Sequence, residues 1–213
     1  MATMPPWLLF LPGMVVAVAL VLWGERTGKR VLVLVFKPLA SARFVAIGWL
    51  LYASPNPPGS WILLALLLCL AGDVLLMLEG GLLPGLVAFL LGHVAYVAAF
   101  HAMAPAHTWP VVLSVPVVVA SALATRWLWP HLGKMRGPVL AYVTVITVMV
   151  WAAAGVVDAE VAPARTLVGA VLFYLSDLSV ARDRFVRKAF ANRAWGLPAY
   201  YLGQLLLALS VVR

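Results

Sequence analysis

The sequence has few charged side chains, and only 10% of its 213 residues are Asp, Glu, Lys or Arg. A soluble domain of this size leaves roughly a third of its chain surface in water and needs polar side chains to cover it. Apolar residues make up 65% of the chain, against roughly 45–50% in soluble proteins. A soluble fold and a disordered chain are therefore both excluded, and an integral membrane protein remains.

Cysteine is almost absent as well. Cys69 is the single cysteine, so neither an intrachain disulfide nor a cysteine-based metal site is available. It lies in an apolar run, where we expect a buried thiol that packs as a small hydrophobe. The chain also lacks the HExxH zinc pattern and the Gly-X-Ser-X-Gly elbow that would mark Ser176 as a nucleophile. We expect no metal and no other cofactor.

Long apolar runs are what the sequence does have. Eight of them are each long enough to cross a bilayer, which takes about 20 residues. They cover approximately residues 7–23, 31–52, 61–78, 82–103, 109–129, 138–157, 164–181 and 194–212. The breaker-rich segment 54–60 and the Gly80-Gly81 pair mark tight connections. The sequence thus predicts an all-α, polytopic integral membrane protein in which residues 1–213 form one domain of eight transmembrane helices.

Positive charge predominates, with 15 Lys and Arg against 7 Asp and Glu and a formal net charge of +8. The connections on one side of the predicted bundle hold eleven of these cations: Arg26, Lys29, Arg30, Arg126, Lys134, Arg136, Arg182, Arg184, Arg187, Lys188 and Arg193. The other side has only Arg165 and Arg213. The positive-inside rule then predicts that both termini are non-cytoplasmic. The leader Met1–Pro6 has no Lys or Arg, so the first run is expected to be a retained span. We expect the basic connections to orient the spans and to contact anionic lipids, not to bind nucleic acid.

Several polar residues lie inside the predicted spans. A charged side chain there costs about 2.5–3.5 kcal/mol on insertion scales, which makes it a functional candidate. Lys37, Asp73 and Asp177 are charged, and His93 and Gln204 are polar groups in two further spans. Counted from the basic side, all five lie between the inner leaflet and the midplane, which predicts one polar chamber open to the cytoplasmic leaflet.

Each of these residues also has a structural interpretation. Lys37 can extend to the inner interface. Either Asp73 or Asp177 can be a structural hydrogen-bond acceptor or a salt-bridge partner of Lys37, and His93 can be a packing residue. Four further acidic residues lie at connections and are expected to be solvated: Glu79, Asp158, Glu160 and Asp183.

Taken together, the polar residues favour either of two chemistries. One is proton transfer within the membrane, and the other is cation binding by Asp73, Asp177 and His93. When two buried carboxyls are neighbours, one keeps its proton while the other stays ionised, especially beside a lysine such as Lys37. That division into acid and base is typical of hydrolases with paired carboxylates.

Five short segments around these residues resemble, in the same order, the YhhN family of membrane proteins, which includes the TMEM86 lysoplasmalogenases. They are Phe36-Lys37-Pro38-Leu39, Leu70-Ala71-Gly72-Asp73-Val74-Leu75-Leu76, Phe89-Leu90-Leu91-Gly92-His93-Val94-Ala95-Tyr96, Tyr174-Leu175-Ser176-Asp177 and Tyr200-Tyr201-Leu202-Gly203-Gln204. The resemblance implies hydrolysis of the vinyl-ether bond of a lysoplasmalogen. The products would be a fatty aldehyde and a glycerophospho-base.

The resemblance also implies roles for the residues. Asp73 and Asp177 are the expected catalytic pair, with the acid unassigned between them. The expected substrate-binding residues are Lys37, His93, Tyr96, Ser176, Tyr200 and Gln204. Lys37 would bind the phosphate or keep one aspartate ionised. We also expect an apolar pocket that extends from the aspartates toward the lipid. The expected partners are a lysophospholipid substrate and membrane lipids.

Two other functions account for part of the pattern. A proton- or cation-coupled transporter of a small amphiphile also needs intramembrane Asp, Lys and His, although paired repeats with broken helices are not evident. A scaffold or lipid-binding protein would leave the polar layer unexplained. The bias toward Ala, Gly, Val and Arg is typical of a high-GC bacterium, which predicts location in a bacterial inner membrane. The sequence leaves headgroup, chain length and oligomeric state open.

Overall fold

The structure is a computed structural model that describes residues 5–52 and 56–210. Most of the leader Met1–Pro6, the beginning of the 54–60 connection and Arg213 lie outside these residues. Regular structure in the described ranges is entirely helical, with short 3-10 or π turns between longer helices. The eight α-helices are α1 (Leu11–Thr27), α2 (Arg30–Leu51), α3 (Pro57–Leu75), α4 (Leu82–Met103), α5 (Ser114–Leu128), α6 (Arg136–Asp158), α7 (Arg165–Ala181) and α8 (Phe190–Ala208).

The eight predicted spans correspond one to one to these helices, but two of them differ in character from the rest. Six helical segments are long and apolar enough to cross a membrane, and they contain α1 to α6. Helix α7 has 17 residues and α8, with 19, includes Asn192, Arg193 and Gln204. These two helices are shorter or more polar because they carry part of the polar interior of the bundle. That α7 and α8 cross the membrane remains a prediction.

Helix α3 begins four residues before the predicted apolar run. Its N-cap is Asn56, whose side-chain oxygen accepts a hydrogen bond from the Gly59 backbone N–H at 2.8 Å. Prolines at the first helical positions have the backbone angle that a helix start needs and lack only an N–H that would have no helical partner. The breaker cluster therefore provides the first turn of α3, not only a loop.

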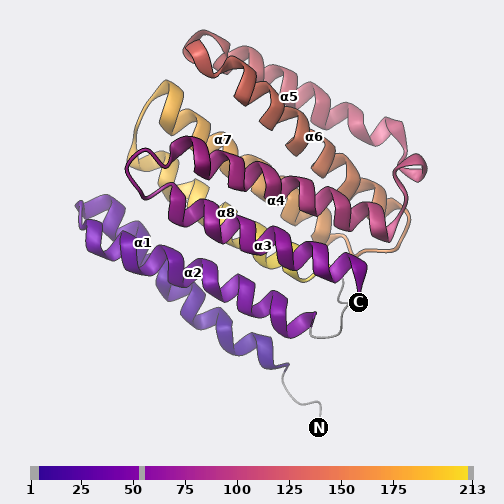
Figure 1. Cartoon of the computed structure of the whole chain (residues 1–213), viewed down its shortest axis with the longest axis horizontal. Helices are drawn as coiled ribbons and strands as arrows, with labels where there is room; N and C mark the ends of the chain where they lie inside the picture. The colour runs from indigo at the N-terminus through magenta and orange to yellow at the C-terminus, as the bar shows by residue number, and fades with distance from the viewer. Residues whose placement is uncertain (1–4, 53–55, 211–213) are drawn as a thin grey trace.

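The helices pack as antiparallel hairpins, and neighbouring hairpins form one bundle (Figure 1). The most extensive contacts are within the pairs α3–α4, α7–α8 and α1–α2. Helices α1 and α2 lie at one edge, α5 lies at the opposite edge against α6, and α3, α4, α7 and α8 are between them. Large apolar side chains cover the outer surfaces, as on α5 with Val115, Val118, Val119 and Leu123. Lipid is the solvent that suits this surface.

Helices α7 and α8 approach each other closely through two glycines. A Cβ added to Gly169 would lie 3.0 Å from the carbonyl oxygen of Gly203, and a Cβ on Gly203 would lie 3.0 Å from that of Gly169. Small residues at such crossings let helix backbones pack tightly in membranes. This crossing brings the polar residues of α7 and α8 toward the same interior.

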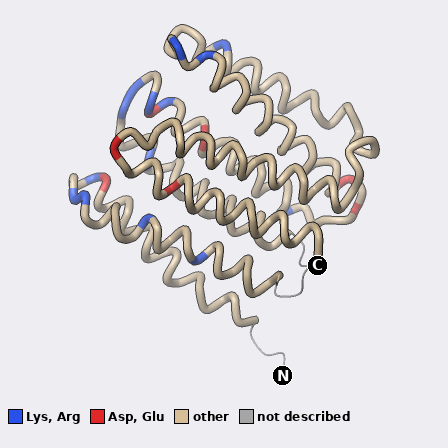
Figure 2. Tube along the Cα trace, in the orientation of Figure 1, with Lys and Arg blue, Asp and Glu red and all other residues tan. Residues whose placement is uncertain are grey.

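The charges gather at one end of the bundle. Figure 2 shows most Lys and Arg at the end that holds the α1–α2, α5–α6 and α7–α8 connections. The start of α1 and the end of α8 lie at the opposite end (Figure 1). Which end faces the cytoplasm stays a prediction.

Candidate active site

Asp73, near the end of α3, is surrounded by hydrogen-bond donors from two other helices. The Nζ atom of Lys37 on α2 lies 3.0 Å from its Oδ1 atom. The Ser41 hydroxyl of α2 and the Tyr200 hydroxyl of α8 each donate to Oδ2 at 2.6 Å. The side chain of Asp73 is 3% exposed. A cation and two hydroxyl donors are partners that suit a carboxylate.

Lys37 does not extend to the membrane interface in this structure, because its ammonium group pairs with Asp73. The residue is buried within α2, and Pro38 follows it inside the same helix. The backbone carbonyl of Lys37 accepts a hydrogen bond from the Tyr201 hydroxyl at 3.2 Å. Helices α2, α3 and α8 are thus joined around one ion pair.

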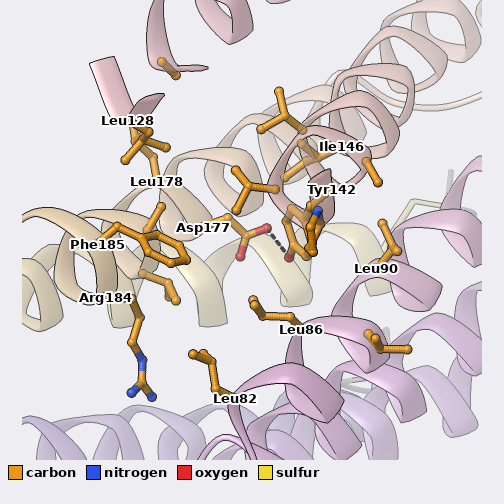
Figure 3. Close-up of a pocket in the computed structure, with 18 of the residues that line it drawn as sticks. Leu82, Leu86, Leu90, Leu128, Tyr142, Ile146, Asp177, Leu178, Arg184 and Phe185 are labelled. Atoms are coloured by element: carbon orange, nitrogen blue, oxygen red, sulfur yellow. Dashed lines mark hydrogen bonds between the residues drawn. The ribbon is translucent and has the colours of Figure 1, made fainter. Parts of the chain in front are cut away.

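Asp177, near the end of α7, has fewer donors. The Tyr142 hydroxyl of α6 donates to its Oδ2 atom at 2.8 Å, as the dashed line in Figure 3 shows. The Nε2 atom of His93 on α4 lies 3.3 Å from the same oxygen. The side chain of Asp177 is 18% exposed, so it is more accessible than that of Asp73.

The contact made by the Nδ1 atom of His93 indicates which ring nitrogen carries a proton. Its Nδ1 atom lies 2.7 Å from the carbonyl oxygen of Phe89, which can only accept, so Nδ1 carries a proton. The ring stacks on Phe173 with centroids 4.3 Å apart. The buried Nε2 atom makes no aligned hydrogen bond with a described residue, and Asp177 is the polar group it faces. The 3.3 Å approach places an imidazole nitrogen and a carboxyl oxygen where a proton can pass between them.

Tyr96 and Gln204 pair with each other. The Tyr96 hydroxyl of α4 donates to Oε1 of Gln204 on α8 at 2.6 Å. The Nε2 atom of Gln204 donates to the sulfur of Cys69 at 3.4 Å. All three side chains are fully buried. The prediction that Cys69 is buried is confirmed, while Tyr96 and Gln204 lie outside the cavity walls described next.

Two cavities meet at Asp177. A polar cavity of about 190 Å³ is lined by both aspartates, together with Lys37, Ser176 and Tyr200. An apolar cavity of about 300 Å³ lies between α4, α5, α6 and α7. Figure 3 shows Asp177 and Tyr142 among the leucines that line it. The walls of the two cavities share Leu86, Tyr142, Asp177, Val180 and Arg184. The predicted apolar pocket is therefore present, and it reaches Asp177 but not Asp73.

Ser176 lines the polar cavity, but its hydroxyl group is already used. It donates to the carbonyl oxygen of Phe173 in the preceding turn of α7 at 2.8 Å. Clusters of three or more His, Cys, Asp or Glu side chains that could hold a metal ion do not occur in the part of the chain that the structure describes. The arrangement therefore brings a carboxyl group and an imidazole together at Asp177 and a carboxyl group and an ammonium group together at Asp73.

Asp183, at the cation-rich end, is buried rather than solvated as predicted. Arg193 Nη2 lies 3.0 Å from its Oδ2 atom, while Asn192 Nδ2 and the Ala189 backbone N–H donate to Oδ1 at 3.0 and 3.1 Å. Burial raises the pKa of Asp183, but the donors outweigh it and hold the pKa below its ordinary value. The expectation failed because the π turn Arg182–Val186 points this carboxylate into the connection that it organises.

Two residues of the site were not predicted from the sequence. Ser41 lies one turn after Lys37 on α2, and this spacing places the two side chains on the same face. Tyr142 is a hydroxyl-bearing residue in the long apolar run of α6. Polarity inside a span is the signal that could have identified both. Neither carries a charge, so neither stands out on an insertion scale.

The chain is similar to known membrane proteins over most of its length. The YhhN family matches residues 32–211. A lysoplasmalogenase of Mycobacterium tuberculosis is 33% identical over 199 residues, which cover 88% of this chain and 72% of the relative. Lysoplasmalogenase TMEM86A of Bos taurus is 32% identical over 165 residues, or 74% and 67% of the two chains. The membrane protein YhhN of Escherichia coli is 30% identical over 182 residues, or 83% and 86%. No solved structure matches the chain significantly.

Proposed function

Because the chain belongs to the YhhN family, we propose that it is a membrane-embedded lysoplasmalogenase. It hydrolyses the vinyl-ether bond of a lysoplasmalogen to a fatty aldehyde and a glycerophospho-base. Relatives at 32–33% identity have that name. One observation of this structure carries the proposal. The carboxyl group of Asp177, which lies 3.3 Å from the imidazole of His93, is where an apolar cavity joins a polar one.

The two cavities match the two ends of the substrate. The alkenyl chain lies in the apolar cavity, and the glycerol with its headgroup lies in the polar cavity. The vinyl ether, which joins these parts, is then next to Asp177 and Tyr142. An apolar cavity with a few polar groups at one end is the usual form of a small-molecule site.

The first step is protonation of carbon. The proton shared by Asp177 and His93 is transferred to the β-carbon of the vinyl ether, and the electron pair of the double bond forms the new C–H bond. The α-carbon and the ether oxygen become an oxocarbenium ion. Asp73, which its three donors keep ionised, stabilises this cation through its charge.

The remaining steps return the proton. Water adds to the α-carbon and gives up a proton to the Asp177–His93 pair, which produces a hemiacetal. The pair then protonates the glycerol oxygen, the C–O bond breaks, and the hemiacetal hydroxyl returns its proton to the pair as the aldehyde forms. The pair thus works in turn as acid, base, acid and base, and it ends in its starting state.

Tyr96 and Gln204 act as positioning residues in this mechanism. Their hydrogen bond joins α4 to α8, and Tyr96 lies one turn from His93 on α4. The pair therefore fixes the helix that holds the imidazole against Asp177. Ser176 and Tyr200 form part of the wall of the polar cavity.

The test uses purified protein in detergent with a 1-alkenyl lysophosphoethanolamine, and free aldehyde is measured. We expect aldehyde release without a membrane gradient. The saturated 1-alkyl analogue should give no product, and the 1-acyl analogue should give no fatty acid. Binding of the lipid without aldehyde release would favour a lipid-binding protein, and movement of lipid that needs a gradient would favour a transporter.

We also propose that the cation-rich end faces the cytoplasm of a bacterial cell, with both termini outside the inner membrane. The distribution of Lys and Arg supports this orientation (Figure 2). His107→Cys and Lys188→Cys, placed at opposite ends, can be labelled in intact cells with an impermeant maleimide. Position 107 should react and position 188 should not, and the reverse pattern would contradict the orientation.

A further inference from the structure

Most charges that line the polar cavity are paired with a charge of opposite sign. Lys37 pairs with Asp73 at 3.0 Å. Arg193 pairs with Glu25 at 3.2 Å and with Asp183 at 3.0 Å. These pairs leave neither of the two cations free to bind a further anion.

Two arginines in the same cavity are not paired. Arg30, at the start of α2, and Arg184, in the π turn after α7, both line the cavity and are exposed. Neither side chain makes a hydrogen bond or an ion pair with another residue of ranges 5–52 and 56–210. The remaining carboxylate of the cavity, Asp177, faces His93. The guanidinium groups of Arg30 and Arg184 are therefore the two cations of this cavity that pair with no other residue of the described ranges.

Both arginines occupy corresponding positions relative to the site. Arg184 follows Asp177 by seven residues, and Arg30 precedes Lys37 by seven residues. Seven residues are two turns of an α-helix, so Arg30 lies about 10 Å along α2 from Lys37 and on the same face, whereas Arg184 lies beyond the end of α7, in the π turn. Arg184 lies in the walls of both cavities, and Figure 3 shows its side chain at the edge of the apolar one.

We propose that Arg30 and Arg184 bind the phosphate group of the substrate lipid. This inference rests on the proposed function, in which the vinyl ether is next to Asp177. Five covalent bonds separate the ether oxygen from the phosphorus of a lysophospholipid, and a flexible arginine side chain can span the rest of the distance. One guanidinium group can donate two parallel hydrogen bonds to two oxygens of a phosphate group, which gives both affinity and a fixed orientation.

The site therefore selects lysophospholipids over neutral glycerol ethers, and the phosphate sets how far the chain enters the apolar cavity. The rest of the headgroup extends past the arginines toward water. The phosphate, and not the base attached to it, is thus the part of the headgroup that this end of the cavity recognises.

The experiment measures binding, so that it does not depend on turnover. The ligands are two saturated, uncleavable ethers with the same chain, 1-O-alkyl lysophosphoethanolamine and 1-O-alkylglycerol. The proteins are wild type, Arg30→Gln, Arg184→Gln and the double variant, purified in detergent. Arg126→Gln, which removes a charge at the same end of the bundle but outside both cavities, is the matched control.

We expect each single variant to weaken binding of the phospholipid about tenfold, which is typical for the loss of a charge-assisted hydrogen bond. Binding of the alkylglycerol and the control variant should stay within twofold of wild type. Equal losses for both ligands, or no loss for the phospholipid, would overturn the proposal. Inorganic phosphate that binds as tightly as the lipid, with the same arginine dependence, would also overturn it by assigning the site to a free anion.

The aldehyde assay separates this inference from the proposed function. If wild type binds the phospholipid through the two arginines but releases no aldehyde from the alkenyl lipid, the hydrolase proposal fails and the phosphate site stands. If wild type and the double variant both release aldehyde equally well from the alkenyl phospholipid and from 1-alkenylglycerol, the phosphate site fails and the hydrolase proposal stands.

Discussion

The two aspartates inside the bundle lie near the ends of their helices, yet their surroundings differ. Asp73 has a lysine and two hydroxyl groups as donors, and of the two cavities it lines only the polar one. Asp177 has one hydroxyl donor and faces a histidine, and it lines both cavities. The first carboxyl group is buried and saturated with donors. The second is more exposed and lies where an alkenyl chain can reach it.

This difference is the reason that the proposed mechanism gives the two aspartates different roles. The donors around Asp73 are partners that suit a carboxylate, so we propose that Asp73 provides the negative charge. Asp177 faces the imidazole of His93, whose Nδ1 atom is bonded to Phe89, so we propose that Asp177 and His93 transfer the proton.

The largest expected effect is the loss of turnover in Asp177→Asn. Asparagine keeps the size of the side chain and can accept from Tyr142, so the fold should persist, but it cannot deliver a proton. General acid catalysis contributes about 10²–10⁴-fold, and kcat should fall by about that factor. Aldehyde release is the readout, and a thermal unfolding midpoint near that of wild type shows that the fold is intact. Asp158→Asn, at the exposed end of α6, is the control. Near-normal turnover in Asp177→Asn would remove the distinction between the two aspartates.

Asp73→Asn should lower turnover, because the charge that stabilises the oxocarbenium ion is lost, and it should also lower stability. It leaves the ammonium group of Lys37 buried without a carboxylate, and breaking a buried ion pair in this way costs about 3–5 kcal/mol. The free energy of unfolding in mixed detergent measures the effect. The double variant Lys37→Met, Asp73→Asn removes the unpaired charge and should recover part of the loss. If Asp73→Asn unfolds like wild type, the carboxyl group is not the ionised partner of Lys37.

The tyrosines beside the two aspartates give a smaller, paired test. Tyr142→Phe removes the hydroxyl that donates to Asp177, and Tyr200→Phe removes one that donates to Asp73. A hydrogen bond to a charged group is worth roughly 1.5–3 kcal/mol. We expect Tyr142→Phe to lower kcat about tenfold with little loss of stability, and Tyr200→Phe to lower stability with the smaller effect on kcat. The opposite ranking would reverse the assigned roles.

The Asp183→Asn variant should give the smallest effect. Asp183 lies in the connection between α7 and α8, and it serves as a reference for Asp73 and Asp177. Its pKa is below the ordinary value, so its stabilising contribution is complete above the ordinary carboxyl pKa near 4 and is lost as the pH falls through the lower, folded value. Unfolding of wild type and Asp183→Asn should therefore differ at neutral pH and converge in acid. A difference that persists at low pH would show that the Asp183 charge is not what organises the α7–α8 connection.

The sequence predicts the helices and the charged residues of the site well, because apolar runs and buried charges both have large free energies in a membrane. Lys37, Asp73 and Asp177 stand out on that basis and do line one cavity. The start of α3 was less predictable because a cap at Asn56 extends the helix beyond its apolar run.

Pairings between helices were not predictable in the same way. Gln204 can face either the polar cavity or the Tyr96 side chain, and the rotation of α4 and α8 about their axes decides between them. Hydropathy does not determine that rotation. The same reason explains why Ser41 and Tyr142 were missed and why the acid was not assigned. The partners of each aspartate come from helices far apart in the chain.

The transfer of a proton from the Asp177–His93 pair to carbon is tested most directly by a reaction in D₂O. The aldehyde released by wild type should carry one deuterium on the carbon next to its carbonyl group, and kcat should be lower than in H₂O. Asp177→Asn should form this labelled product at no more than about a hundredth of the wild-type rate. An unlabelled aldehyde from wild type would mean that the vinyl ether is cleaved without protonation at carbon, and it would contradict the mechanism proposed for this site.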